Sequence, residues 1–210
     1  MKDNFPSHIP IFPLSGVIYF PNTNLPLNIF EERYLNLVND CMKTNKLMGM
    51  IQSQKNSENV YKVGCLGKIS DFKKNDDGRI IINLTGLTRF EVVKELKTET
   101  LYRKFEVKYE KFIKDTTNKS TNFNDKTIRN ILLNKIKTFF NKRDILLNWS
   151  ELERLDIDQQ VNTLSMITPI SNEEKQKLLE TVSMAEKIQV FSDIIEFYLH
   201  GSNNENSTTQ

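Results

Sequence analysis

Apolar and polar positions follow two different periods along this chain, close to two in the first half and close to 3.6 in the second. One early stretch departs from this rule, because its apolar side chains recur at helical spacing at Phe30, Tyr34, Leu37, Val38, Cys41 and Met42. Asn28 suits the N-cap position and Glu31 follows three residues later, as in a capping box, so we expect the helix to begin at about Ile29. We also expect Phe30 and Tyr34 to pack in the core on its buried face.

The rest of the first half is rich in β-branched and aromatic residues. Residues 9–21 contain three prolines, and because proline cannot donate to a ladder, this region is predicted to form edge or bulged strands. The turn sequence Asn-Asp-Asp-Gly at 75–78 joins the β-rich segments 65–74 and 79–85, which predicts a hairpin. Further strands are predicted at 47–52, 60–63, 88–96 and 104–110. Many short strands around one inserted helix indicate a small closed or nearly closed barrel.

A polar segment separates the two periodic halves. Its Thr, Asn and Lys residues leave almost no apolar side chain, which is typical of a linker. Helical spacing follows, with capping boxes expected at Ser150, Ser171 and Ser183 and a helix end near Gly201. The chain is therefore predicted to be an α+β protein with four parts: a barrel at 1–113, a linker at 114–124, a helical bundle at 125–200 and a disordered tail at 201–210.

Composition and charge narrow the functional classes. The chain has 29 basic and 27 acidic residues, so net charge gives little reason to expect a polyanionic partner. Cys41 and Cys65 fall in apolar elements without metal spacing and are expected to be small buried hydrophobes. The N-terminus lacks the features of a signal peptide, and no apolar run approaches the ~20 residues that span a bilayer. We therefore expect a cytoplasmic protein with no membrane partner.

The sequence contains few of the residues and motifs that are typical of enzyme active sites. The two histidines, His8 and His200, lie near the chain ends, which argues against a His-based triad or a zinc site. The segment 64–69 resembles a phosphate loop only superficially, because Lys62 and Ile69 stand where such a loop needs Gly and Ser or Thr. We recognise no Ser-Lys peptidase motif, although composition alone does not exclude such a dyad or another hydrolase. The prediction is a protein without enzymatic activity, cofactor or metal.

Two groups of residues are candidates for binding a peptide. Tyr19, Phe20 and Phe72 are possible surface anchors for an apolar ligand, although aromatic residues in strands more often belong to the core. Glu31, Glu32 and Arg33 lie in the first turn of the helix predicted from about Ile29, on its solvent-exposed side, where they can line a groove. The alternative for these three charges is ordinary helix solvation and pairing with the helix dipole.

Four ordered motifs, at 9–14, 25–34, 63–69 and 77–90, resemble the N-terminal substrate-binding domain of the Lon protease family. The helical segment 164–179 is similar to the bundle of the short, stand-alone bacterial members of that family. The motif positions that we take as structural signatures are Pro13, Phe30, Tyr34, Gly64, Gly86, Arg89 and Phe90. Glu32 and Asn28 depart from the family pattern, which usually has Pro and often His at these positions.

The resemblance implies a PUA-like β-barrel with one inserted helix, followed by a helical bundle. It also implies a non-catalytic module that holds unfolded or tagged polypeptides and is linked to proteolysis or protein quality control, with Lon protease itself as a candidate partner. An RNA-binding PUA-like module is the alternative. Lys104, Lys108 and Lys111 support it weakly, because Glu106 and Glu110 interrupt the basic stripe and argue against nucleic acid. The oligomeric state stays open.

Overall fold

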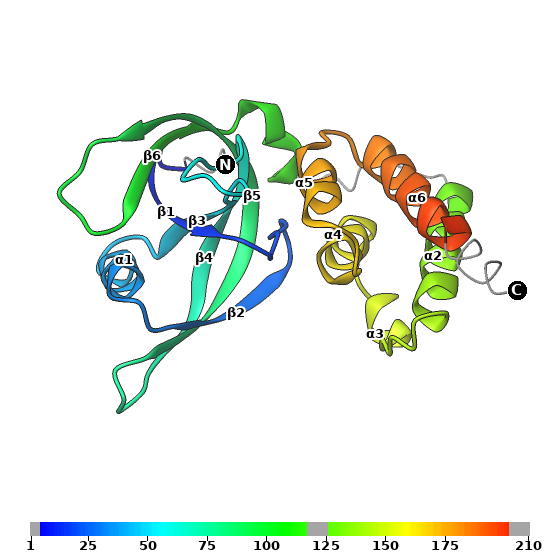
Figure 1. Cartoon of the computed structure of the whole chain (residues 1–210), viewed down its shortest axis with the longest axis horizontal. Coiled ribbons are helices and arrows are strands. Elements are labelled where there is room, and N and C mark those ends of the chain that lie inside the picture. Colours follow the sequence, from blue (N-terminus) through cyan, green and yellow to red (C-terminus); the bar gives the residue numbers. More distant parts are fainter. Residues whose placement is uncertain (1–4, 117–125, 202–210) are drawn as a thin grey trace, which may run out of the picture.

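Two lobes, a β-barrel and a helical bundle, make up the computed structural model, which describes residues 5–116 and 126–201 (Figure 1). The barrel lobe contains a six-stranded mixed sheet and one inserted helix, α1 (Glu32–Met42). The strands are β1 (His8–Leu14), β2 (Asn24–Ile29), β3 (Leu47–Gln52), β4 (Val63–Lys74), β5 (Ile80–Leu96) and β6 (Arg103–Lys108). The predicted α+β class is confirmed.

Closure of the barrel follows from the pairing of β5 with β6. The sheet order is β2-β5-β4-β3-β1-β6, and the additional β5–β6 pairing joins five strands into a ring, from which β2 projects because it pairs only with β5. The predicted hairpin at 75–78 is present between β4 and β5, with Gly78 at a positive φ of 85° that an L side chain adopts rarely. The segments predicted as separate strands at 79–85 and 88–96 form the single strand β5.

The proline-rich strand β1 is not at an edge, which corrects the expectation from its sequence. It lies between β3 and β6 in the ring, parallel to β3 and antiparallel to β6. The pairing is staggered, because β6 accompanies residues 8–11 and β3 accompanies residues 11–14. Pro10 therefore pairs with β6 only and Pro13 with β3 only. Proline has no N–H group to donate, and it is tolerated here because neither proline needs a hydrogen bond to a strand on its unpaired side.

The start of α1 also differs from the prediction. Asn28 and Ile29 belong to β2, and the helix begins at Glu32 after an N-cap, Glu31, whose side chain makes no capping bond. All six residues of β2 pair with β5, so a complete ladder outweighs the local capping preference of Asn28. The alternation of β2 buries Ile29 and turns Phe30 outward, where it is 66% exposed; its predicted place in the core was wrong.

The buried face of α1 otherwise agrees with the predicted stripe. Tyr34, Leu37, Val38 and Cys41 are buried in the barrel core. Cys65 is buried as well, and burial raises the pKa of both thiols. Both cysteines are free and lie among apolar side chains, so their predicted role as small buried hydrophobes is confirmed.

The second lobe contains five α-helices in the described part of the chain. They are α2 (Lys126–Asn141), α3 (Trp149–Leu152), α4 (Ile157–Ile167), α5 (Asn172–Glu180) and α6 (Met184–Gly201). Ser171 and Glu174 form a complete capping box on α5, and Ser183 Oγ accepts a bond from the Glu186 N–H at the start of α6. The cap predicted at Ser150 is wrong, because α3 already begins at Trp149 and Asn148 is its N-cap.

The predicted linker and tail lie mostly outside the described residues. Of the linker, Lys114 and Asp115 end a 3-10 helix, η1 (Glu110–Asp115), which packs against the barrel. Residues 117–124 and 202–210 are not described. No helix of the described part is long and apolar enough to cross a membrane.

Candidate functional site

A groove of about 610 Å³ opens at the N-terminal end of α1. It lies where this helix meets the end of β1, the loop after β3 and the facing ends of β5 and β6. Its lining residues are Phe12, Pro13, Leu14, Ser15, Glu31, Arg33, Tyr34, Ser53, Glu58, Glu95 and Arg103.

Two stacked aromatic rings form the apolar part of this groove. The Phe12 and Tyr34 rings lie 4.0 Å apart between centroids, and both residues are buried below 10% exposure, so they offer edges rather than faces. Burial raises the pKa of the Tyr34 hydroxyl, which therefore stays protonated at neutral pH. The groove thus has a rigid aromatic base positioned by β1 and α1.

Ion pairs form the walls. Arg103 donates two hydrogen bonds to the Glu95 carboxylate, at 2.7 and 2.6 Å, and one to the Glu58 carbonyl oxygen at 2.8 Å. The bonds from Arg103 lower the pKa of Glu95. Arg33 donates to Glu31 at 3.0 and 2.8 Å, and both side chains are about half exposed. An exposed pair of this kind contributes little to stability, so Arg33 can exchange its partner for a ligand at low cost.

The structure brings together only part of the predicted binding set. Glu31 and Arg33 line the groove, whereas Glu32 is exposed beside it without contributing to the lining. Tyr19 and Phe20 are at most 2% exposed and offer no surface to a peptide, so their candidacy was wrong. The Tyr19 hydroxyl donates to the Leu84 carbonyl at 2.6 Å, inside the barrel.

Phe72 lies elsewhere, 39% exposed in a separate hollow of about 350 Å³ on the β2-β5-β4 face. Pro26 and Ile81 line this hollow with it. The hollow is smaller and shares no lining residue with the groove. We therefore take the groove at α1 as the candidate site.

Phe12, Glu95 and Arg103 are among the lining residues that the sequence pattern missed. Phe12 lies within a recognised motif, which was an available signal. Glu95 and Arg103 become neighbours of Arg33 only because β5 and β6 close the ring, so no local pattern reveals them. In the described residues, no group of three or more His, Cys, Asp or Glu side chains lies together in a way that could hold a metal ion.

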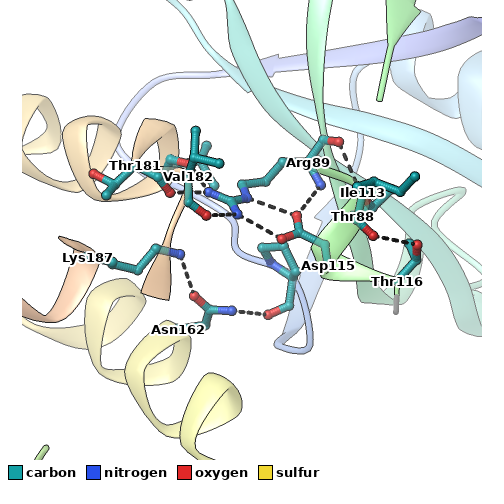
Figure 2. Close-up of polar contacts among 11 residues, drawn as sticks. Thr88, Arg89, Ile113, Asp115, Thr116, Asn162, Thr181, Val182 and Lys187 are labelled. Atoms are coloured by element: carbon teal, nitrogen blue, oxygen red, sulfur yellow. Dashed lines mark hydrogen bonds and ion pairs between the residues drawn. The ribbon is translucent and has the colours of Figure 1, made fainter. Parts of the chain in front are cut away.

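Among the signature positions, Arg89 has the most contacts (Figure 2). Its side chain is 4% exposed and forms a two-pronged ion pair with Asp115, at 2.9 and 2.8 Å. It also donates to three carbonyl oxygens, that of Leu179 in the last turn of α5 and those of Thr181 and Val182 between α5 and α6. Arg89 therefore ties the barrel to the bundle rather than lining the groove.

Three other signature positions, Gly64, Gly86 and Phe90, serve close packing in the barrel. A Cβ on Gly64 would overlap the Phe90 ring and the Met50 carbonyl oxygen. A Cβ on Gly86 would collide with the Phe20 carbonyl oxygen. Phe90 is fully buried in a cluster of barrel side chains that also contains Ile9, Ile11 and Leu66. Glycine at both positions allows the backbone to approach its neighbours closely.

Comparison with known proteins identifies the family. The model of the ATP-dependent protease La (LON) substrate-binding domain matches residues 8–196. The Lon protease of Dictyoglomus thermophilum is 26% identical over 192 residues, which are 89% of this chain and 24% of that protein. The Lon protease of Malacoplasma penetrans is 28% identical over 195 residues, covering 83% of this chain and 23% of that protein. The chain therefore spans about a quarter of the length of these relatives.

Solved structures share the fold. The Lon N-terminal domain protein from Xanthomonas campestris superposes with a TM-score of 0.63 and 21% identity, covering 88% of this chain and 96% of that one. The N-terminal domain of the Mycobacterium avium complex Lon protease gives a TM-score of 0.69 at 14% identity, covering 90% and 98%. The family model spans both lobes, so the chain belongs to the Lon substrate-binding domain family.

Proposed function

We propose that this chain is a non-catalytic, cytoplasmic module that binds unfolded or tagged polypeptides in the groove at α1. The observation that carries the proposal is an open groove with an aromatic base and exchangeable ion pairs, in a chain whose family is defined by substrate binding. The groove volume of about 610 Å³ suits a few residues of an extended chain rather than a folded partner.

The walls indicate how a peptide would be held. Arg33 and Arg103 face the base from two sides, each already bonded to a glutamate. A carboxylate or backbone carbonyl of the peptide replaces part of these bonds, while the displaced glutamate meets a basic side chain or N–H group. Phe30, exposed directly before Glu31, adds an apolar contact next to the groove. Such mixed contacts favour broad selection of unfolded segments, as quality control requires.

Binding of a labelled, unfolded polypeptide, followed by fluorescence anisotropy, tests the proposal. Arg33→Glu should weaken binding by about tenfold or more, because it removes a donor from the groove and places a second carboxylate there beside Glu31. Arg79→Glu is the matched control, since Arg79 forms an equally exposed pair with Asp77, two residues earlier, at the tip of the β4–β5 hairpin. Unchanged binding of the Arg33 variant would remove the groove from the proposal.

Two further measurements test the competing functions. Binding of single-stranded RNA that disappears at high salt, without binding of polypeptide, would favour the RNA alternative. Lys108 and Lys111 both pair with Glu91 in this structure, which gives that alternative no support. Hydrolysis of unfolded casein, with or without ATP, would contradict the non-catalytic assignment. Co-sedimentation with full-length Lon protease tests whether Lon is a partner.

A further inference from the structure

The contact between the two lobes combines an apolar cluster with buried polar groups, and one of these groups is a lysine, Lys187 of α6 (Figure 2). Lys187 is 2% exposed, and its Nζ donates a hydrogen bond to Asn162 Oδ1 of α4 at 2.9 Å. Asn162 Nδ2 in turn donates to the Pro21 carbonyl oxygen of the barrel at 3.0 Å. This relay joins α6 to the barrel through one amide.

An ammonium group is poorly accommodated at this position. Lys187 Nζ lies 5.4 Å from the centre of the Phe20 ring, a contact that favours the charged form, but the Asn162 amide is its one hydrogen-bond acceptor among the described residues. A protonated amine has three donors to satisfy and an uncharged amine has two, so a single acceptor leaves fewer buried donors unpaired in the uncharged form. The geometry therefore favours the uncharged form.

The charged groups around Lys187 come from four elements. Arg89 of β5 repels a proton on Nζ, while Asp115 of η1 and Asp158 of α4 attract one, as does any thiolate form of Cys65 on β4. Asp115 is already engaged by both prongs of Arg89, and burial raises the pKa of Asp158 and so disfavours its charged form. Burial is the largest influence on Lys187 and, with Arg89, lowers its pKa from 10.5 to about 7.

We propose that the contact between the lobes is a protonation-linked joint, in which the bundle docks on the barrel with the Lys187 amine uncharged and a proton on Nζ opposes docking. The proposal does not depend on polypeptide binding in the groove. It assigns to Lys187 a conformational role that an apolar side chain or an arginine could not fill.

The direction of the pH effect follows from proton binding. An undocked Lys187 returns to its ordinary pKa of 10.5, so between about pH 7 and 10.5 the docked state binds fewer protons than the undocked state. Docking therefore strengthens as pH rises through this window, by up to about tenfold per pH unit, and becomes independent of pH below about 7, where both states are protonated.

The experiment combines a direct titration with a measurement of shape. NMR of the full chain, with labelled lysine side chains, should show Lys187 titrating near pH 7, well below its ordinary pKa of 10.5. Small-angle scattering between about pH 6.5 and 9.5 should show a more extended population at the lower pH for the wild-type chain. Because unfolding also expands the chain, helix content from circular dichroism is followed over the same range and should stay constant.

Three variants make the outcome decisive. Lys187→Gln keeps a donor for Asn162 without a titratable charge, so its docking should not change with pH in this window. Lys187→Arg stays charged and should be extended throughout. Lys177→Gln, which changes an exposed lysine on α5, is the matched control and should behave as wild type. A Lys187 pKa above about 9.5, or the same pH dependence in wild type and Lys187→Gln, would overturn the proposal.

Discussion

Single buried side chains decide how the two lobes are joined, and Arg89 is the main one. It lies on a barrel strand, yet its bonds reach η1 and three carbonyl oxygens at the C-terminal end of α5 and just after it, which are 90 to 93 residues away in the chain. Arginine suits this position because its planar group presents several donors in fixed directions, whereas lysine presents one flexible charge. The Arg89–Asp115 ion pair is almost fully buried, so the loss of either partner would be costly.

Replacing Arg89 by Met should lower the free energy of unfolding by about 3–5 kcal/mol, because it leaves Asp115 as an unpaired charge in a buried site. Arg33→Met is the control, since Arg33 is paired to a carboxylate at the surface and its removal should cost at most about 1 kcal/mol. Urea unfolding of both variants measures the difference. Equal costs would show that Asp115 is well solvated without its partner.

At the scale of elements, the ends of helices show where local patterns succeed. Ser171 and Glu174 satisfy each other's backbone groups within four residues, so the capping box could be read from the sequence. Asn28 was an equally good N-cap candidate by local sequence, but it belongs to β2, where it pairs with β5. This ladder depends on residues 80–85, which are far away in the chain. The α3 prediction failed more narrowly, because Asn148 lies two residues before Ser150 and took the cap position.

The two serines provide a direct test of these assignments. Ser171→Ala should cost about 1 kcal/mol of unfolding free energy, because the Glu174 N–H loses its acceptor at the start of α5. Ser150→Ala should stay within about 0.5 kcal/mol, because Ser150 is already inside α3 and caps nothing. Urea unfolding measures both values. A larger cost at Ser150 would contradict the helix start at Trp149.

At the scale of the whole molecule, one buried apolar cluster spans both lobes, beside two clusters whose buried residues belong to the barrel alone. Ile18, Phe20 and Val63 of the barrel lobe belong to the same buried cluster as the bundle helices. Gln176 of α5 adds a polar link by donating to the Val63 carbonyl oxygen at 3.1 Å. While the lobes are docked, this shared cluster should make them unfold together.

Phe20→Ala should therefore lower the stability of the bundle as well, although Phe20 belongs to the barrel lobe. We expect a loss of about 3–5 kcal/mol, because a fully buried aromatic ring leaves a cavity. The fluorescence of Trp149, the single tryptophan, reports unfolding of the bundle and should show this loss in full. Phe72→Ala is the control, since Phe72 is 39% exposed and should cost far less. A normal Trp149 transition in the Phe20 variant would show that the lobes unfold independently.

Sequence alone determined the features that depend on short-range order. The periods of two and 3.6 predicted an α+β chain, the Asn-Asp-Asp-Gly turn predicted the β4–β5 hairpin, and ordered motifs indicated the family. Tertiary structure alone decided the closure of β5 on β6, the extension of β2 through Asn28, and the meeting of Arg33 with Glu95 and Arg103 around one groove. It also placed Lys187 in a dry contact between lobes. The physical reason is that periodicity and caps act within a few residues, whereas ladders, buried charges and grooves depend on partners far away in the chain.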